Sequence, residues 1–139
     1  MRRFLTIMIL YVLAMFLLPS CEENTRENYL GYGTLIELNQ DAFIFSSQGG
    51  SATLKCTNLS KFQISSLEIP SSPGPDILPT KDEYYRTISV AADGILISRI
   101  DNTSFLITVN PSDIARDWIL WMQSGNSFKP IPISQKFLD

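Results

Sequence analysis

The sequence contains no histidine and only two cysteines, and these shortages remove several classes of function. Histidine is the commonest general base and a frequent metal ligand. Its absence excludes Ser-His-Asp and Cys-His catalysis, His-ligated zinc and haem held by histidine. A nucleophilic cysteine also needs a base within hydrogen-bond reach. We therefore expect a protein that is not an enzyme, with no catalytic residues, no metal and no cofactor.

Basic residues are also scarce. The chain has 11 Lys and Arg against 14 Asp and Glu, a formal net charge of −3 over 139 residues. Nucleic-acid binding needs a basic field that this composition does not supply, so no nucleic-acid partner is expected. The length fits a single domain, which can bury a core of its own without disulfides or metal.

The N-terminus reads as an export signal. Two basic residues precede an apolar run, Phe4–Leu18, that is too short to be a comfortable membrane span. The run ends in Leu18-Pro19-Ser20-Cys21, which resembles the lipobox of bacterial lipoproteins. We expect residues 1–20 to be the signal peptide, Cys21 to carry the lipid anchor that holds the protein to a membrane, and residues 21–33 to be a polar tether. The alternative is an ordinary secretory signal with a cysteine nearby.

An acidic pair follows the cysteine. Glu22-Glu23 resembles the surface-export signal of lipoproteins from the Bacteroidetes group. This resemblance predicts an outer-membrane, lipid-anchored and surface-exposed protein. The alternative is that residues 22–30 are only a polar tether, in which case the lipoprotein could face the other side of the same membrane.

Residues 34–139 show the pattern of an all-β domain. Short alternating apolar runs are separated by turn residues, and no stretch sustains a helical period. We predict an immunoglobulin-like antiparallel β-sandwich of about eight strands. Besides short pieces at Leu35–Leu38 and around Phe43 and Phe45, the strands are expected near 51–57, 62–69, 84–90, 95–100, 105–109, 117–124 and 128–135.

Three local features give sharper expectations. Ser46-Ser47-Gln48-Gly49-Gly50 supplies a turn, because glycine tolerates positive φ. The inward parity changes between Ile64 and Leu67, which requires a bulge near Ser65-Ser66. Pro130 and Pro132 remove two N–H donors on one side of the last strand, which predicts a sheet edge.

The run Phe43–Leu54, the segment Asn58–Ser66 and the closing Ile131-Pro132-Ile133-Ser134-Gln135 together resemble the BACON family. These are immunoglobulin-like domains of the Bacteroidetes associated with carbohydrate binding. Phe62 stands where the family usually has tryptophan and is expected to fill the same core position. The resemblance places Trp118, Leu120 and Met122 on the inner face and Trp121 on the outer face.

Three aromatic residues are the candidate ligand-binding residues. An exposed Trp121 could stack against a sugar ring, unless the Pro-rich segment or an edge strand covers it. Tyr84 and Tyr85 are adjacent in a predicted strand, so at most one of them points inward and the other could line a ligand surface.

Two further features are open to interpretation. Residues 70–83 hold four of the eight prolines and predict an ordered but irregular loop, which could serve recognition. Cys56 lies on the apolar face of its strand and is expected to be an inert buried thiol.

The sequence thus predicts a non-catalytic cell-surface binding module, with a polysaccharide or mucin glycan as its partner. The alternative is an interaction or scaffold protein that docks on another envelope protein and binds no sugar. The immunoglobulin-like fold serves both roles and does not decide between them.

Overall fold

The computed structural model describes residues 35–137. The predicted signal peptide, the lipid-bearing Cys21 and the tether at 21–33 lie outside the described residues. These assignments therefore stay predictions.

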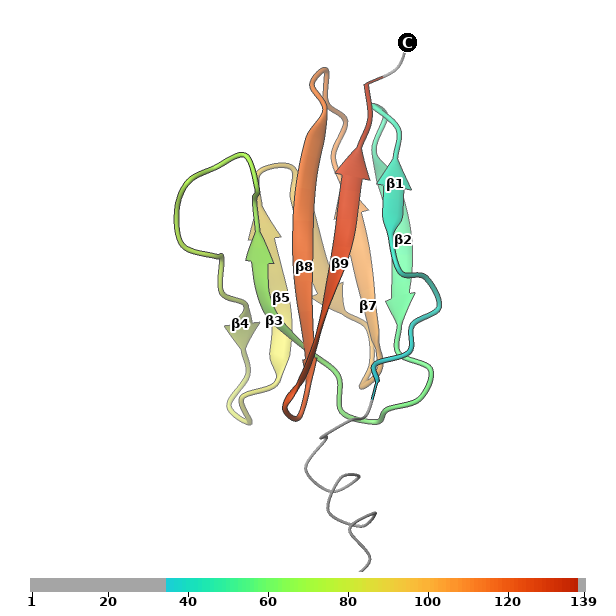
Figure 1. Ribbon diagram of the computed structural model, residues 1–139, viewed down its shortest axis with the longest axis vertical. Coiled ribbons are helices and arrows are strands. Elements are labelled where there is room, and N and C mark those ends of the chain that lie inside the picture. Colours follow the sequence, from blue (N-terminus) through green and yellow to red (C-terminus); the bar gives the residue numbers. More distant parts are fainter. Residues whose placement is uncertain (1–34, 138–139) are drawn as a thin grey trace, which may run out of the picture.

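The described residues form nine strands in two packed sheets (Figure 1). One sheet has four strands in the order β1-β9-β8-β3, and the other has five in the order β2-β7-β6-β5-β4. The strands are β1 (Phe43–Phe45), β2 (Gly50–Lys55), β3 (Gln63–Glu68), β4 (Thr80–Lys81), β5 (Thr87–Ala92), β6 (Ile95–Arg99), β7 (Ser104–Val109), β8 (Arg116–Ser124) and β9 (Ser127–Gln135).

This arrangement confirms the predicted immunoglobulin-like β-sandwich, with two differences in its strands. Residues 35–38 form only an isolated bridge, between Leu38 and Cys56, instead of a strand. The two-residue strand β4 was not predicted. Pairing is antiparallel throughout except between β1 and β9, which run parallel. Within residues 35–137, no helix is long and apolar enough to cross a membrane.

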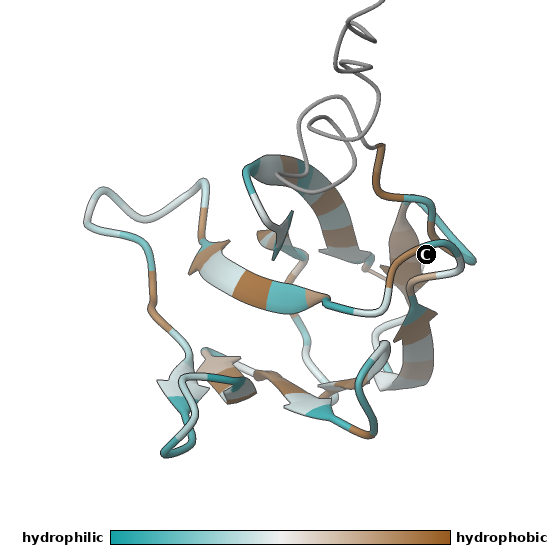
Figure 2. Ribbon diagram, turned by 90° about the horizontal axis from the view of Figure 1, so that it is seen from below, coloured by the Kyte–Doolittle hydropathy of each residue, from teal (hydrophilic) through white to brown (hydrophobic). Residues whose placement is uncertain are grey.

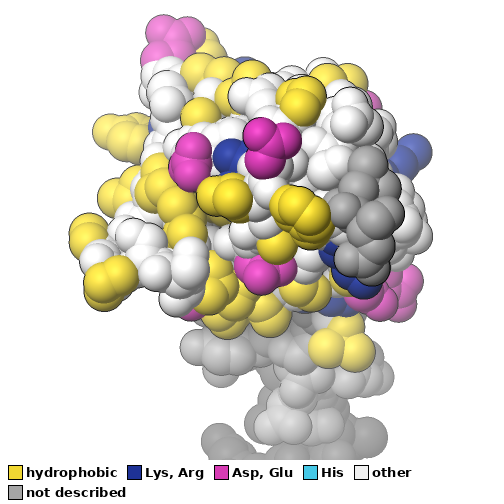
Figure 3. Space-filling view, turned by 90° about the horizontal axis from the view of Figure 1, so that it is seen from above, with side chains coloured by type: hydrophobic (Ala, Val, Ile, Leu, Met, Phe, Trp, Pro, Cys, Tyr) yellow, Lys and Arg dark blue, Asp and Glu magenta, His cyan; other side chains and the backbone are white. Residues whose placement is uncertain are grey.

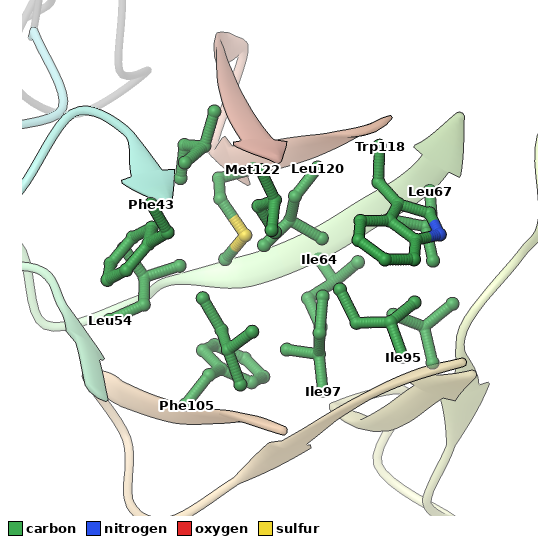
Figure 4. Close-up of a cluster of buried hydrophobic side chains, with 14 of the residues drawn as sticks. Phe43, Leu54, Ile64, Leu67, Ile95, Ile97, Phe105, Trp118, Leu120 and Met122 are labelled. Atoms are coloured by element: carbon green, nitrogen blue, oxygen red, sulfur yellow. The ribbon is translucent and has the colours of Figure 1, made fainter. Parts of the chain in front are cut away.

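The core lies between the two sheets, as the alternation of apolar residues predicts. Figure 2 shows the sheets end-on, with hydrophobic and polar residues alternating along the strands. Trp118, Leu120 and Met122 of β8 point inward toward β6 and β7 (Figure 4). Phe62 is buried and packs edge-to-face on Phe105, with ring centroids 5.9 Å apart, so it does fill a core position. Cys56 is buried, as expected of an inert thiol.

The expected bulge and the glycine turn are both present. The pairing of β3 with β8 shifts register between Ile64 and Ser66, and both Ile64 and Leu67 are buried as a result. Gly49 and Gly50 have φ of 71° and 138° in the turn between β1 and β2. A Cβ on Gly49 would lie 2.1 Å from the carbonyl oxygen of Val109, so only glycine fits at that position.

The expectation that the last strand is an edge strand is wrong for its C-terminal part. Residues 133–135 of β9 pair with β1 on one side and with β8 on the other. Pro130 and Pro132 precede the part that β1 covers, so their missing N–H groups cost no ladder bond to β1. The two prolines therefore mark the part of β9 that β1 does not pair with, and β9 is not an edge strand along its whole length.

A buried amide closes the end of the sandwich from which the C-terminus leaves. Gln135 is 1% exposed, and its Nε2 donates to the carbonyls of Ser46, Ser47 and Asn110 at 3.2, 3.4 and 2.9 Å. Its Oε1 accepts from Nε and Nη2 of Arg116 at 3.2 and 2.9 Å. Figure 3 shows this end, where acidic side chains lie among hydrophobic ones.

Candidate functional site

The turn between β4 and β5, residues 82–86, presents Tyr84 and Tyr85 to solvent at the opposite end of the sandwich (Figure 1). Asp82 N donates to Arg86 O at 2.9 Å, and Tyr85 N donates to Asp82 O at 3.0 Å. Tyr85 has a φ of 59°, the left-handed conformation that such three-residue hairpin loops require of their last residue. We call residues 82–86 the tyrosine turn.

The side chain of Asp82 holds the tyrosine turn in shape. Its Oδ1 accepts from the backbone N–H groups of Tyr84 and Arg86, both at 2.9 Å, and its Oδ2 accepts from Arg86 Nε at 2.8 Å. Desolvation acts to raise the pKa of Asp82, but these hydrogen bonds and the charge of Arg86 outweigh it and hold the pKa below the ordinary 3.8. The carboxylate form of Asp82 is therefore the one that fits the turn.

The prediction that Tyr84 and Tyr85 belong to a strand is wrong, because β5 begins only at Thr87. Asp82 caps a hairpin here, and this turn chemistry overrides the β-propensity of two tyrosines. Both rings are exposed, at 71% and 79%, and so neither points into the core. Arg86 lies over the Tyr84 ring, 5.9 Å from its centroid. Each ring lines a different hollow in the surface.

The hollow beside Tyr84 has a volume of about 430 Å³, and its other walls include Ser60, Arg86, Arg99 and Asn102. We call it the Tyr84 hollow. Arg99 is fixed there by its own hydrogen bonds, to the carbonyls of Thr87 at 2.7 Å and Phe62 at 2.9 Å. Its guanidinium also lies 4.5 Å from the centroid of the Phe105 ring, which makes Arg99 a rigid part of the site.

The hollow beside Tyr85 has a volume of about 420 Å³, and we call it the Tyr85 hollow. Lys81, Ser65 and Gln123 line it, and the bulge in β3 supplies Ser65 as the extra residue. Lys61 and Gln63 line both hollows, so the two hollows meet along these side chains. The tyrosine turn therefore stands beside two neighbouring hollows, and one of its two tyrosines lines each of them.

Trp121 lies on the outer face of β8, as expected, and of the two alternatives left open for it, an exposed platform or a covered ring, the structure favours the covered ring. Its ring is half-buried, and its Nε1 donates to Glu68 Oε2 on the edge strand β3 at 3.0 Å. Trp121 lines neither the Tyr84 nor the Tyr85 hollow. The alternative that an edge strand covers Trp121 in part is the one that holds.

The proline-rich segment 70–83 follows an ordered, largely irregular path, as predicted. Leu67 and Ile77 exchange backbone hydrogen bonds of 2.9 and 2.8 Å, which extends pairing on the outer side of β3. Ser66 Oγ donates to Asp76 Oδ2 at 2.8 Å. The segment ends in β4 and so delivers the chain to the tyrosine turn, which gives it a positioning role.

Hydrolytic chemistry of the paired-carboxylate kind needs a carboxyl group with a raised pKa. The carboxyl groups whose pKa values clearly depart from normal, Asp82 and Asp101, both shift downward. Asp101 shifts because it accepts a hydrogen bond from the Thr103 backbone N–H, at 2.9 Å. These groups are stabilised as carboxylates, and they suit structural and binding roles better than proton transfer.

Sequence reasoning missed Lys61, Gln63, Lys81 and Gln123 as part of the site. They come from the segment that leads into β3 and its first residue, from β4 and from the end of β8, and only the packing of the two sheets brings them together. The one local sequence signal for the turn at this site was Asp82, because aspartate favours turns and here lies four positions before Arg86.

Comparison with known proteins supports the fold alone. No protein-family model matches the chain, and no curated protein matches it. Among solved structures, an NMR structure of a protein from Bacteroides thetaiotaomicron is similar, with a TM-score of 0.58 and 15% sequence identity. The match covers 77% of this chain and 91% of that one. At this identity the likeness concerns the fold alone, and the resemblance to the BACON family stays a prediction.

Proposed function

We propose that the protein is a non-catalytic binding module for glycans and that Tyr84 and Tyr85 are the rings on which sugar units stack. The observation that carries this proposal is that the left-handed position of the turn holds a tyrosine, Tyr85, and not a glycine or asparagine. A bulky side chain in the left-handed region costs about 1–2 kcal/mol, and such strain is concentrated at functional sites. Here the strain presents a ring that is 79% exposed beside a polar hollow.

The chemistry around the rings suits a sugar. An aromatic face offers an apolar surface to the C–H groups of a pyranose, while nearby polar side chains fix its hydroxyl groups. Gln63, Ser65 and Gln123 supply such groups beside Tyr85, and Ser60 and Asn102 supply them beside Tyr84. Because the two hollows meet along Lys61 and Gln63, a linear oligosaccharide could occupy both at once.

The test is affinity electrophoresis of the full-length protein, purified in detergent, against plant, microbial and mucin polysaccharides. We expect retardation on at least one polysaccharide, and its loss in Tyr84→Ala and Tyr85→Ala. Trp121→Phe is the matched control, because it alters an aromatic residue outside both hollows and should leave retardation intact. Retardation that survives both tyrosine variants and disappears in the Trp121 variant would contradict the proposal.

The location of the protein is also proposed. Leu18-Pro19-Ser20-Cys21 and the following Glu22-Glu23 support a lipid anchor on the outer membrane with the domain facing outward. The similar fold of a protein from Bacteroides is compatible with that group of bacteria. Metabolic labelling with a fatty-acid analogue should mark the wild type and not Cys21→Ala. Protease added to intact cells should digest the domain if it faces outward.

The second candidate function is docking on another envelope protein without any sugar ligand. One surface feature favours it. On the outer face of the four-stranded sheet, Phe128, Pro130, Pro132 and Ile44 are exposed. A stable partner would have to bury about 800 Å² on each side. Phe128→Ser should then abolish capture of the envelope partner, whereas glycan binding through the tyrosine turn should be unaffected by this change.

A further inference from the structure

The charged side chains that line the two hollows are all basic, although the protein as a whole is acidic. Arg86 and Arg99 line the Tyr84 hollow, Lys81 lines the Tyr85 hollow, and Lys61 lines both. No Asp or Glu is among the residues that line either hollow. The chain as a whole carries a net charge of −3. This concentration of cations is therefore a local property of the candidate site.

The neighbouring acidic residues are Asp82, Glu83 and Asp101, and none of them lines either hollow. Asp82 is bound to Arg86 and to two backbone N–H groups of the turn. Asp101 accepts from the backbone N–H of Thr103 at 2.9 Å and from its hydroxyl group at 3.3 Å. Glu83 is exposed in the turn and lines neither hollow. Asp82 thus offsets the charge of Arg86, and Lys61, Lys81 and Arg99 stand against the negative charges of Glu83 and Asp101, so the surroundings of the hollows keep an excess of positive charge.

Arg99 holds its charge without a carboxylate partner. Its guanidinium donates to the carbonyls of Phe62, Thr87, Asp101 and Asn102. The pKa of Arg99 is lowered, first by burial and then by the positive charge of Arg86, while the charges of Asp82 and Asp101 act to raise it. Arg86 and Arg99 both line the Tyr84 hollow. Two cations facing one hollow favour the entry of an anion.

We propose that the ligand of the tyrosine turn is an acidic glycan, whose sugar units carry carboxylate or sulfate groups. This inference rests on the proposed glycan-binding function and specifies its substrate class. Lys61 lies where the two hollows meet, so it could contact an anionic group whichever ring the neighbouring unit stacks on. Charge-assisted hydrogen bonds from lysine and arginine are the usual means of recognising such groups.

The experiment compares each acidic polymer with a neutral version of the same backbone. Polygalacturonate is paired with its carboxyl-reduced form, and chondroitin sulfate with its desulfated and carboxyl-reduced form. Binding of the full-length protein in detergent is measured by isothermal titration calorimetry. We expect at least one acidic polymer to bind at least about tenfold more tightly than its neutral partner. Raising the salt from about 50 mM to about 500 mM should weaken that binding, because it shortens the Debye length.

Charge variants locate the effect. Lys61→Gln and Lys81→Gln should each weaken binding of the acidic polymer by about two- to fivefold, the range of a partly solvated ion pair. The controls are Lys55→Gln and Lys136→Gln, which remove exposed lysines that line neither hollow. They should leave the affinity unchanged.

Three results would overturn the inference. Equal affinity for an acidic polymer and its neutral partner would reject the charge preference and leave the glycan-binding function standing. An equal loss in the control variants would show attraction by overall charge instead of recognition at the hollows. Absence of binding to all four polymers, together with absence of retardation in the wider panel, would reject both the inference and the function on which it rests.

Discussion

Replacing Tyr85 by glycine should make the protein more stable and abolish its binding. Tyr85 is the one non-glycine residue with a positive φ in the described part of the chain, at 59°. Glycine removes the left-handed penalty of about 1–2 kcal/mol. It also gives the unfolded chain extra freedom, which costs about 0.4–1 kcal/mol. The free energy of unfolding should therefore rise by about 1 kcal/mol.

Tyr84→Gly is the matched control. Tyr84 is exposed to a similar degree, 71% against 79%, but its φ is not positive. Its replacement therefore incurs only the unfolded-state cost, together with the loss of the contact between its ring and Arg86. The unfolded-state cost is nearly the same in the two variants, so their difference is the left-handed penalty of about 1–2 kcal/mol plus the ring contact with Arg86, about 0.5 kcal/mol, with Tyr85→Gly the more stable.

Urea unfolding, followed by the fluorescence of the buried Trp118, gives the two free energies. If Tyr85→Gly is destabilised as much as Tyr84→Gly, the backbone of Tyr85 is not strained, and the structural reason for assigning function to the turn is lost. If Tyr85→Gly is more stable and still binds as the wild type does, the strain exists but does not serve binding.

Six other substitutions, two of them controls, test the surrounding structure. Gly49→Ala should lower the unfolding free energy by about 3 kcal/mol, because the residue has a φ of 71° and its new Cβ would lie 2.1 Å from a backbone oxygen. Gly74→Ala is the control and should change the unfolding free energy little, because nothing lies within 4 Å of the new Cβ. Arg99→Gln should lower the free energy of unfolding in urea by about 2–3 kcal/mol, because it removes hydrogen bonds to backbone carbonyls. Arg99→Lys should lower it less, because lysine keeps the positive charge although it lacks the planar guanidinium group. Gln135→Leu should cost about 2–4 kcal/mol, because it removes the five hydrogen bonds that this buried amide makes with three backbone carbonyls and with Arg116. Asp82→Asn should weaken polysaccharide retardation and remove part of the pH dependence of stability.

The pH dependence attributed to Asp82 has a definite sign. Its pKa in the folded protein is lower than the ordinary 3.8, so the folded state binds a proton less readily than the unfolded state. The stabilisation is therefore complete above about pH 4 and is lost as the pH falls through the lowered pKa. Asp101, whose pKa is also lowered, contributes in the same direction. Urea unfolding between about pH 2 and pH 6 should show a smaller slope in Asp82→Asn.

The sandwich could be predicted because its signals are local and repeated. Alternation along its strand predicts that Leu54 lies in the core, the family resemblance predicts the same of Trp118 and Leu120, and the parity change between Ile64 and Leu67 predicts the bulge. The proline argument for β9 failed in part because it could not foresee that the short strand β1 pairs with residues 133–135 from the other side. Pairing between residues about ninety positions apart cannot be predicted from the local sequence of either strand.

The candidate site was harder to predict for the same reason. The sequence predicts that Tyr84 and Tyr85 lie in a strand, because β-propensity alone does not include the hydrogen-bonding capacity of Asp82, which places them in a turn. Trp121 was placed on the correct face, yet its contact with Glu68 depends on the packing of the edge strand β3. The cations that line the hollows come from three separate segments, and only the folded chain brings them together.

The most direct test of the central claim is affinity electrophoresis of the wild type beside the double variant Tyr84→Ala, Tyr85→Ala. We predict that a polysaccharide retards the wild type and that the double variant migrates as it does in a gel without polysaccharide, while its urea unfolding shows an intact fold. Equal retardation of the two proteins would contradict the assignment of glycan binding to the tyrosine turn.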